Sequence, residues 1–331
     1  LTGYCIAGKN TIRVTVDNTL VPNSRWYSGA GIFRDVYLLT RKENHVVDFE
    51  IATDINGSDG LINFKNKSNV DLVLKLNANK VCECKSNESV SLTIKDAKLW
   101  SAEEPNLYEL DIESSEEVIY QKVGICTSKV VDGIYYFNNK PIKFYGANRH
   151  DMHPTKGPAV SKEDMLKDIL LMKSLNVNAV RTSHYPSSPL FYEMCNEYGL
   201  YVVSESDLEN HGGVSAGEPG FNYPRGFTLI ADRPEFIDQI VLRQVCNYEV
   251  NKNFSCVVIY SLGNESGWGD GLREGFKKMK SLTNKPIHYE GLWEFKHVDG
   301  EDEYYSLDID MVSRMYATPE WMLNEYLNDF R

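Results

Sequence analysis

The stretch Val257-Val258-Ile259-Tyr260-Ser261-Leu262-Gly263-Asn264-Glu265 decides the fold of this chain. Its first four residues are apolar and predict a buried β-strand, and the segment then runs on to an amide and a carboxylate. Strands that end in such side chains are typical of enzymes built on a parallel sheet, whose sites lie at the carboxyl ends of the strands. The same pattern recurs on both sides of this segment.

Strands and helices alternate from about residue 129 onward, which indicates a parallel sheet. Capping residues and apolar stripes predict three helices, at residues 161–172, 188–199 and 234–251. The first of these opens with the capping-box pair Ser161 and Asp164. Besides the strand at 257–260, short apolar runs predict strands at 141–146, 177–180, 200–203, 286–289 and 310–312.

Polar residues follow the ends of successive predicted strands, which is the distribution expected of a (β/α)8 TIM barrel. The segment Gly146-Ala147-Asn148-Arg149-His150 is not the glycine-rich turn that a doubly wound dinucleotide-binding fold requires. Six strands are predicted before the chain stops. We therefore expect residues 129–331 to form a TIM barrel that is incomplete.

The residues before the barrel are predicted to be all-β. Between residues 42 and 128, short alternating runs such as 72–76 and 90–94 are separated by turn-forming residues such as Asn56-Gly57-Ser58-Asp59-Gly60. This spacing favours an immunoglobulin-like β-sandwich. Residues 1–41 are also strand-like, with apolar and polar residues alternating through 12–16.

The chain has 331 residues and a net charge of −12, with 42% hydrophobic and 25% charged residues, as is ordinary for a globular protein. It has no basic stripe, so nucleic acid is not expected as a partner. No apolar run is long enough to cross a bilayer, so no membrane association is expected. The first residues, Leu1-Thr2-Gly3-Tyr4, carry neither an initiator Met nor a signal pattern, which indicates a cut inside a larger protein.

The cysteines are dispersed, and most have apolar neighbours. An odd, scattered set of seven is typical of reduced thiols, so we expect a cytoplasmic protein. Cys82-Glu83-Cys84 is the close pair, and the alternating pattern around it favours a strand over a metal site.

Each predicted strand of the barrel is followed by polar side chains that are candidates for a site. Taken alone, each has an ordinary structural explanation, since a Glu after a strand is commonly solvated or ion-paired and a lone His is commonly a satisfied structural residue. Their convergence on one rim favours a functional site. In strand order the candidates are Asn148, Arg149, His150 and Asp151; Arg181, Ser183 and His184; Glu205, Asp207, Glu209 and His211; Asn264 and Glu265; Glu290; and Arg314 and Tyr316.

Glu265 is the sharpest of these candidates. Burial and neighbouring carboxylates raise the pKa of a carboxyl group at such a place, which suits a general acid, and the Asn264 amide beside it suits a sugar hydroxyl. Glu209 and His211 lie two residues apart in an extended segment and face the same side. With a third carboxylate they would form a cation site that suits Mg²⁺, and also Mn²⁺ or Zn²⁺.

These motifs, in this order, resemble the catalytic barrel of glycoside hydrolase family 2, and within it the β-galactosidases. Upstream, residues 28–37 resemble the end of the family's sugar-binding jelly-roll domain, and residues 99–108 resemble its immunoglobulin-like second domain. The resemblance implies the domain ranges 1–41, 42–128 and 129–331. The barrel motifs that carry it are residues 146–154, 179–186, 207–212, 259–266 and 289–291.

The resemblance also implies a function, the hydrolysis of terminal β-D-galactosyl residues with retention. Glu265 would be the general acid/base, and Asn264 would hold the hydroxyl next to the anomeric carbon. Glu209, His211 and Glu265 would share a magnesium ion.

The remaining roles implied by the resemblance concern the substrate. His150 and His184 would contact the galactosyl group, Arg181 would orient the nucleophile, and Tyr316 would lie close to it. The family's β-glucuronidases share an arginine-to-His-Tyr-Pro motif, but the Glu209/His211 pair and the Arg149-His150 segment favour a galactosidase.

Two departures from the family's pattern change the expectations. The family's nucleophile is a Glu at the end of the seventh barrel strand, so we expect it to lie beyond Arg331 and this chain alone to be inactive. Glu290 is the alternative nucleophile within the chain. The family's sodium site uses an Asp where this chain has Asn23-Ser24-Arg25-Trp26, so Na⁺ is left out of the site.

Two other classes of function stay open. One is a non-catalytic carbohydrate-binding or scaffold protein, and the other is metal-assisted hydrolysis of a different bond. For the full-length protein we expect a β-galactoside substrate and a homo-oligomer.

Overall fold

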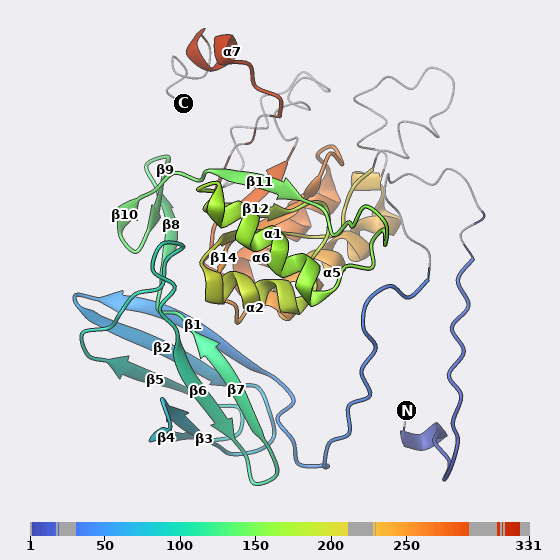
Figure 1. Cartoon of the computed structure of the whole chain (residues 1–331), viewed down its shortest axis with the longest axis vertical. Coiled ribbons are helices and arrows are strands. Elements are labelled where there is room, and N and C mark those ends of the chain that lie inside the picture. The colour runs from blue at the N-terminus through green and yellow to red at the C-terminus, as the bar shows by residue number, and fades with distance from the viewer. Residues whose placement is uncertain are drawn as a thin grey trace.

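The computed structural model describes residues 2–17, 19, 31–210, 228, 230–290, 310–311, 313 and 315–324. These residues form a β-sandwich and, beside it, an α/β unit (Figure 1). The upstream residues 5–17 and 31–42 run as extended chain outside any described strand. No helix in these ranges combines the length and the apolar character that a membrane span requires.

The sandwich has two antiparallel sheets, ordered β1-β2-β5 and β4-β3-β6-β7. Their inner faces meet in a core to which Ile62, Phe64, Leu74, Leu110 and Ile112 each contribute a fully buried side chain. The predicted sandwich fold is confirmed. Its strands are β1 (Phe49–Asn56), β2 (Asp59–Asn66), β3 (Leu72–Leu76), β4 (Asn79–Cys84), β5 (Ser89–Ile94), β6 (Tyr108–Glu113) and β7 (Val118–Val123).

A small antiparallel sheet connects the sandwich to the α/β unit. It consists of β8 (Ser128–Val131), β9 (Ile134–Phe137) and β10 (Lys140–Pro141). The strand predicted at 141–146 is therefore wrong in its bounds, since Pro141 ends β10 and the barrel strand begins at Gly146. The apolar residues between them, Ile142 and Phe144, pack against the barrel core instead of pairing in a sheet.

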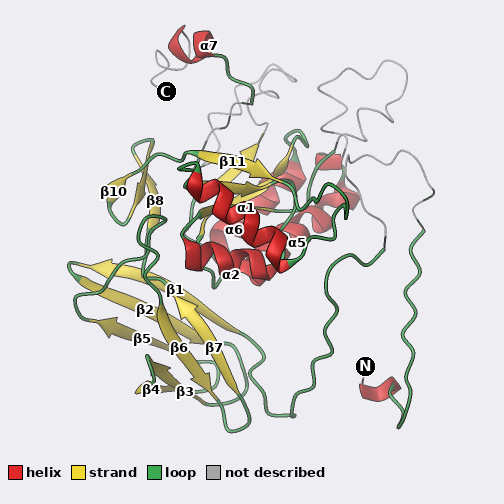
Figure 2. Ribbon diagram, viewed as in Figure 1, coloured by secondary structure: helices red, strands yellow, loops and turns green. Residues whose placement is uncertain are grey.

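The α/β unit is built on a five-stranded parallel sheet ordered as in the chain, β11-β12-β13-β14-β15. Every residue of β14 is buried, as expected of a central parallel strand. The helices that alternate with these strands pack along the outside of the sheet (Figure 2). The strands are β11 (Gly146–Arg149), β12 (Ala179–Thr182), β13 (Tyr201–Glu205), β14 (Val257–Asn264) and β15 (Ile287–Glu290). This sheet is a partial TIM barrel, and the predicted fold class is confirmed.

The helices begin and end where their capping residues predict. Ser161 and Asp164 form both hydrogen bonds of a capping box before α1 (Lys162–Ser174). Helix α2 (Pro189–Tyr198) ends at Gly199, which has a left-handed conformation. Helix α5 (Pro234–Asn251) has the bounds that the sequence predicts. Helix α6 (Asp270–Leu282) was not predicted, and a short helix, α7 (Pro319–Asn324), and a 3-10 turn, η1 (Thr2–Tyr4), complete the set in the described ranges.

The buried face of helix α5 includes Ile240 from its apolar stripe, but it is more polar than the stripe predicts. The buried face carries amides, with Gln244 donating to the carbonyl of Leu262 and Asn247 to that of Ser204. Phe236, one of the apolar residues of the stripe, is 38% exposed. The reason is that the strand ends beneath α5 present backbone carbonyls, which amide side chains satisfy and apolar ones do not.

Two predicted strands are absent from the described residues. Asp310 and Met311, from the predicted sixth barrel strand, are not in a strand, and Val312 lies outside the described ranges. The Asp310 carboxylate instead accepts from the backbone N–H of Ile287 and from Lys280. Residues 12–16 alternate as predicted but form no strand, because no described segment pairs with them, and Ile12 is 71% exposed.

Trp100 joins the sandwich to the α/β unit. Its backbone pairs with Ile125 in the sandwich, while its fully buried indole packs edge-on against Phe137 and Tyr201. The indole N–H donates to the carbonyl of Asn196 at 2.9 Å. The two units therefore share a core at this point.

All seven cysteines are free thiols, and Cys82 and Cys84 lie in strand β4 as predicted.

Candidate active site

Polar side chains gather at the carboxyl ends of β11 to β15, and Glu205 lies at their centre. It is the last residue of β13 and is 0% exposed. Its carboxylate accepts from Arg181 Nε at 2.6 Å, from Ser261 Oγ at 2.7 Å and lies 2.7 Å from His184 Nδ1. Burial alone would raise the pKa of Glu205, but the charge of Arg181 and the bonds from His184 and Arg181 outweigh it, and the pKa falls to about 2.

Arg181 connects this carboxylate to the amide at the end of β14. Its Nη2 donates to Asn264 Oδ1 at 2.8 Å, and its Nη1 donates to Asn148 Oδ1 at 3.3 Å. Asn264 in turn donates from Nδ2 to Glu209 Oε1 at 2.9 Å, and the two residues form a parallel β-bridge. Asn264 is thus held from both sides, so its side chain has one orientation.

Glu265 follows Asn264 and is 8% exposed. Its φ of 39° lies in the left-handed region, which non-glycine residues adopt at a cost of about 1–3 kcal/mol. Backbone hydrogen bonds hold this conformation, since the N–H of Glu265 donates to the carbonyl of Glu290 and its own carbonyl accepts from Asn210. Gly263, at φ 149°, lies so close to Leu208 that a Cβ atom would approach the Leu208 carbonyl to 2.9 Å. This turn places Glu265 beside Glu209 and Glu290.

Two histidines form the adjoining part of the rim. The rings of His150 and His184 meet edge to face, with centroids 5.2 Å apart. The buried Asp151 next to His150 accepts from Arg149 at 2.5 Å and from Arg34 at 3.2 Å. Arg34 belongs to the extended chain that precedes the sandwich, and it also donates to the carbonyl of Pro186 at 2.6 Å. An upstream segment is therefore anchored beside the histidines.

Strand β15 closes the described part of the rim. His288 Nδ1 lies 3.0 Å from Ser261 Oγ, and its Nε2 lies 3.4 Å from Glu290 Oε2. Burial alone would raise the pKa of Glu290. The hydrogen bond and charge of His288 and the charge of Arg181 lower this pKa by more than burial raises it, so the net shift is downward. Glu290 therefore belongs to the same electrostatic network as Glu205.

Comparison with known proteins gives this arrangement a family. The model described as "Glycosyl hydrolases family 2, TIM barrel domain" matches residues 128–330, and the one described as "Glycosyl hydrolases family 2" matches residues 31–125. The chain belongs to glycoside hydrolase family 2.

Curated β-galactosidases resemble the chain over almost its whole length. A β-galactosidase of Staphylococcus xylosus is 38% identical over 99% of this chain, and one of Actinobacillus pleuropneumoniae is 34% identical over 96%. The chain spans only 34% of the length of either relative.

Solved structures of β-glucuronidases share the fold. A β-glucuronidase from Ruminococcus gnavus superposes with a TM-score of 0.64 at 20% identity, covering 72% of this chain and 43% of its own. A β-D-glucuronidase from Dictyoglomus thermophilum gives a TM-score of 0.62 at 23% identity, covering 84% and 50%. At this level of identity the likeness concerns the fold alone.

The predicted family 2 site residues fall into three groups. One hydrogen-bonded rim brings together Arg181, His184, Asn264, Glu209 and the backbone of Glu265, with His150 packed against His184. Tyr316 is not brought to it among the described residues, because its segment leads into α7 apart from the sheet and its side chain is 87% exposed (Figure 1). His211, Arg314 and the Asn23–Trp26 stretch lie outside the described residues.

Sequence reasoning gave no role to Glu205, Ser261 or His288. Glu205 was one of many polar residues after a strand, and only its contacts distinguish it. A usable signal was present in the sequence, however, since Glu205 and Ser261 are polar residues that come at the end of apolar runs. In the structure the two residues pair with each other in the register of β13 and β14.

The predicted magnesium ligands fit a cation in part. Glu209 and Glu265 lie on backbone segments that the Glu209–Asn264 bridge holds side by side. Two carboxylates at one rim are suitable ligands for a hard divalent cation. Within the described ranges no group of three His, Cys, Asp or Glu side chains is placed to hold a metal, and the third predicted ligand, His211, is not among them.

Proposed function

We propose that this chain is the part of a retaining β-galactosidase that carries its general acid/base, Glu265. The observation that carries the proposal is the position of Glu265 at the barrel rim, next to an Asn264 amide whose orientation Arg181 and Glu209 fix. The β-galactosidase names of the relatives support galactosides as substrates. The substrates would be terminal β-D-galactosyl residues, as in lactose.

In a retaining mechanism one carboxylate attacks the anomeric carbon while a second carboxyl group, about 5 Å away, protonates the leaving oxygen. Glu265 would give this proton and then take one from the water that releases the sugar. The attacking carboxylate is proposed to come from residues beyond Arg331. Glu290 is the alternative, because its backbone carbonyl accepts from the N–H of Glu265. Burial alone would raise the pKa of Glu290, but the hydrogen bond and charge of His288 and the charge of Arg181 outweigh burial, so the pKa is lowered and the carboxylate stays ionised.

The remaining side chains would bind and orient the sugar. Asn264 would hold the hydroxyl next to the anomeric carbon, and His150 and His184 would contact the other galactosyl hydroxyls. Arg181 would orient the attacking carboxylate, and Tyr316 would approach it once the site is complete. The Glu205 carboxylate keeps Arg181 and His184 in fixed positions, so the site is organised before substrate enters.

Glu209, Glu265 and His211 are proposed to bind Mg²⁺, and Mn²⁺ is a suitable substitute. When bound, the cation would fix the Glu265 carboxylate and add positive charge to the rim. The pairing of Glu209 with Asn264 supports this ligand set, because it holds the first carboxylate beside the second. Na⁺ is not proposed.

A galactoside is favoured over a glucuronide by the charges of the rim. A glucuronide carries a carboxylate, which a binding site usually meets with an available cation. In the described part of the rim the arginines are engaged, Arg34 and Arg149 with Asp151 and Arg181 with Glu205. A neutral sugar is the better match.

The seven free cysteines support a cytoplasmic protein, and no nucleic-acid or membrane partner is proposed. A homo-oligomer is proposed for the full-length protein. Sedimentation velocity of the purified protein measures this directly.

The experiment that tests the proposal replaces Glu265 by Gln in the full-length protein. We expect kcat/KM on lactose to fall by at least about 10³-fold, within the usual reach of general acid catalysis. The loss should be smallest for galactosides with a nitrophenyl leaving group, because such a group departs without a proton. Glu274→Gln on the exposed side of α6 is the matched control and should keep full activity. Equal losses on every leaving group would refute the role of Glu265 as the acid.

A further inference from the structure

A cavity of about 560 Å³ lies between the sandwich and the α/β unit. Thr53 and Cys126 line it from the sandwich side, and Val257 and Val258, at the amino end of β14, line it from the barrel. It is thus at the opposite end of the sheet from Asn264 and Glu265. The exposed Lys129 and Asn284 also line it, so it reaches the surface.

More lysines than acidic residues line the cavity, although the protein as a whole is acidic. Four lysines line it, Lys129, Lys252, Lys280 and Lys285, against the two acidic residues Glu50 and Asp54. The chain as a whole has a net charge of −12. A concentration of lysines in an enclosed space attracts anions, because the surrounding low dielectric strengthens their field.

Three of these lysines already have partners. Lys252 pairs with Asp48 at 2.7 Å and with Glu249, Lys280 pairs with Asp310 at 2.9 Å, and Lys129 donates to an amide oxygen. Glu50 is likewise engaged, by Lys67 at 2.8 Å and by the hydroxyl of Tyr248 at 3.1 Å.

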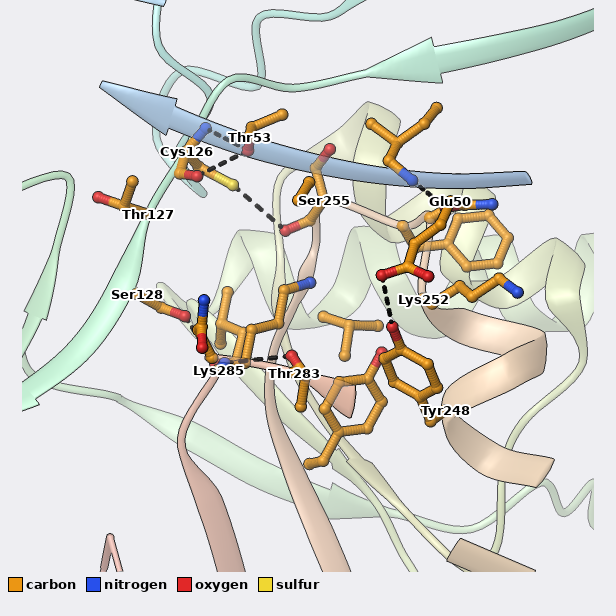
Figure 3. A pocket seen from close by; sticks show the side chains of 18 of the residues that line it. Glu50, Thr53, Cys126, Thr127, Ser128, Tyr248, Lys252, Ser255, Thr283 and Lys285 are labelled. Carbon is orange, nitrogen blue, oxygen red and sulfur yellow. Dashed lines mark hydrogen bonds between the residues drawn. The ribbon is translucent and has the colours of Figure 1, made fainter. Parts of the chain in front are cut away.

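Lys285 differs from the other three. Within the described part of the chain, its ammonium group has no carboxylate within ion-pair distance and no hydrogen-bond acceptor; it lies 6.0 Å from the ring of Tyr260. Figure 3 shows Lys285 on one side of the cavity, with Glu50 and Tyr248 on the other. Burial lowers the pKa of Lys285, as it does for any ammonium group that lacks a nearby counter-charge.

Tyr260 supplies a second group without a partner. Its side chain is 1% exposed and lines the same cavity, yet its hydroxyl forms no hydrogen bond with any described residue. Burial raises the pKa of this phenol well above its ordinary value, so it remains a neutral donor. A buried hydroxyl without a partner is uncommon and usually marks the place of a ligand or a water.

We propose that this cavity is a binding site for a small oxyanion, a carboxylate or a phosphate, which the Lys285 ammonium and the Tyr260 hydroxyl hold. The anion would neutralise the Lys285 charge, which lies partly buried in the cavity wall, and the phenol would donate to one of its oxygens. The site is separate from the rim and does not depend on the proposed glycosidase activity.

Isothermal titration of the full-length protein with inorganic phosphate, and separately with acetate, at constant ionic strength tests the proposal. We expect saturable binding of at least one probe with a Kd of about 1 mM or tighter. The preferred probe distinguishes a phosphate ligand from a carboxylate. Lys285→Met should weaken binding at least tenfold, and Tyr260→Phe, which removes one oxygen and keeps the shape, about tenfold.

The matched control is Lys277→Met on the exposed face of α6, which should bind as the wild type does. The same probes should raise the thermal unfolding temperature of the wild type and not of Lys285→Met. The unfolding temperature without the probes shows whether Lys285→Met is still folded. If it is not, the loss of binding in Tyr260→Phe tests the proposal instead. The proposal is wrong if the wild type binds neither probe, or if Lys285→Met and Tyr260→Phe both bind as tightly as the wild type.

Discussion

Glu205 is a carboxylate that stays charged while fully enclosed by protein. An isolated buried charge is strongly unfavourable, and here a cation, a histidine and a hydroxyl compensate for the lost water. Removing such a carboxylate takes from the largely buried Arg181 its nearest counter-charge and leaves it only Glu290, at 3.9 Å, which is usually more harmful than removing an exposed ion pair. Glu205 therefore links the stability of the barrel to the order of the rim.

The low pKa of Glu205 predicts a stability difference that depends on pH. Because folding lowers this pKa from 4.5 to about 2, the stabilisation is complete above about pH 4.5 and is lost as the pH falls toward 2. We expect the free energy of unfolding of Glu205→Gln to be lower than that of the wild type at pH 6, and about 2 kcal/mol of this difference to disappear by pH 3. Urea titrations at the two pH values, with Glu274→Gln as the control, measure it. A difference independent of pH would contradict the role of the charge.

At the residue scale, sequence patterns found the rim but not its centre. Asn264, Glu209, Arg181 and His184 were predicted from motifs, and the structure brings them into contact. Glu205 was among the candidates but was given no role, because its importance depends on three partners from β12, the loop after it and β14, which are distant in the chain. Hydrogen bonds between such distant residues leave no local signal.

Gly199 shows how a helix end can fix the packing between units. It ends α2 at φ 77°, and a Cβ there would lie 2.3 Å from the carbonyl of Ala102, which belongs to the segment between β5 and β6. Lys173 of α1 donates to both carbonyls, those of Ala102 and Gly199. The end of α2 and the edge of the sandwich are thus in backbone contact.

Gly199→Ala should therefore lower the free energy of unfolding by more than the left-handed backbone conformation at this position alone explains. Gly133 is the matched control, since it has φ 73° and no atom lies within 4 Å of the position that a Cβ would take. Gly133→Ala should lower the free energy of unfolding by about 1 kcal/mol, the cost of the left-handed conformation, and Gly199→Ala by about 1–3 kcal/mol more. Urea unfolding of the two variants compares them. Equal losses would mean that Ala102 moves aside without cost.

At the element scale, sequence patterns predicted helices better than strands. Helix-start signals such as the capping box before α1 and the proline that opens α2 and α5 are local, so these helices begin where expected. The strand predicted at 141–146 was misplaced, because its apolar residues serve the packing beneath the barrel. The buried amides of α5 were not predicted for a related reason, since they satisfy carbonyls that only the folded sheet presents.

Trp100 is the largest fully buried side chain in the described part of the chain, and it lies where the sandwich meets the barrel side. Its indole is fully buried among Phe137, Tyr201 and the carbonyl of Asn196. Trp100→Ala should lower the free energy of unfolding by about 3–5 kcal/mol, the usual loss for a buried Trp. Calorimetry of the full-length protein should also resolve the sandwich and the barrel as separate transitions. Tyr120→Ala, at a residue 78% exposed in β7, is the control and should change little. A loss below about 1 kcal/mol would show that the indole is not essential to the junction.

At the scale of the whole molecule, the sequence predicted the architecture and not the contact between its parts. Alternating runs and turn residues indicated the sandwich, and alternating strands and helices indicated the barrel. The cavity lined by Lys285 and the contact of Arg34 with Asp151 join segments far apart in the chain. Such contacts depend on how two finished surfaces meet, which no single segment encodes.

The shared core around Trp100 limits how evolution or an engineer can recombine these modules. A chimaera that took the barrel from this protein and the sandwich from a distant relative would place a foreign side chain where the indole belongs. Residues 99–102 would have to be transferred together with the barrel, although in the sequence they belong to the sandwich. The segment that can be exchanged between relatives without loss of packing is therefore larger than either the sandwich or the barrel.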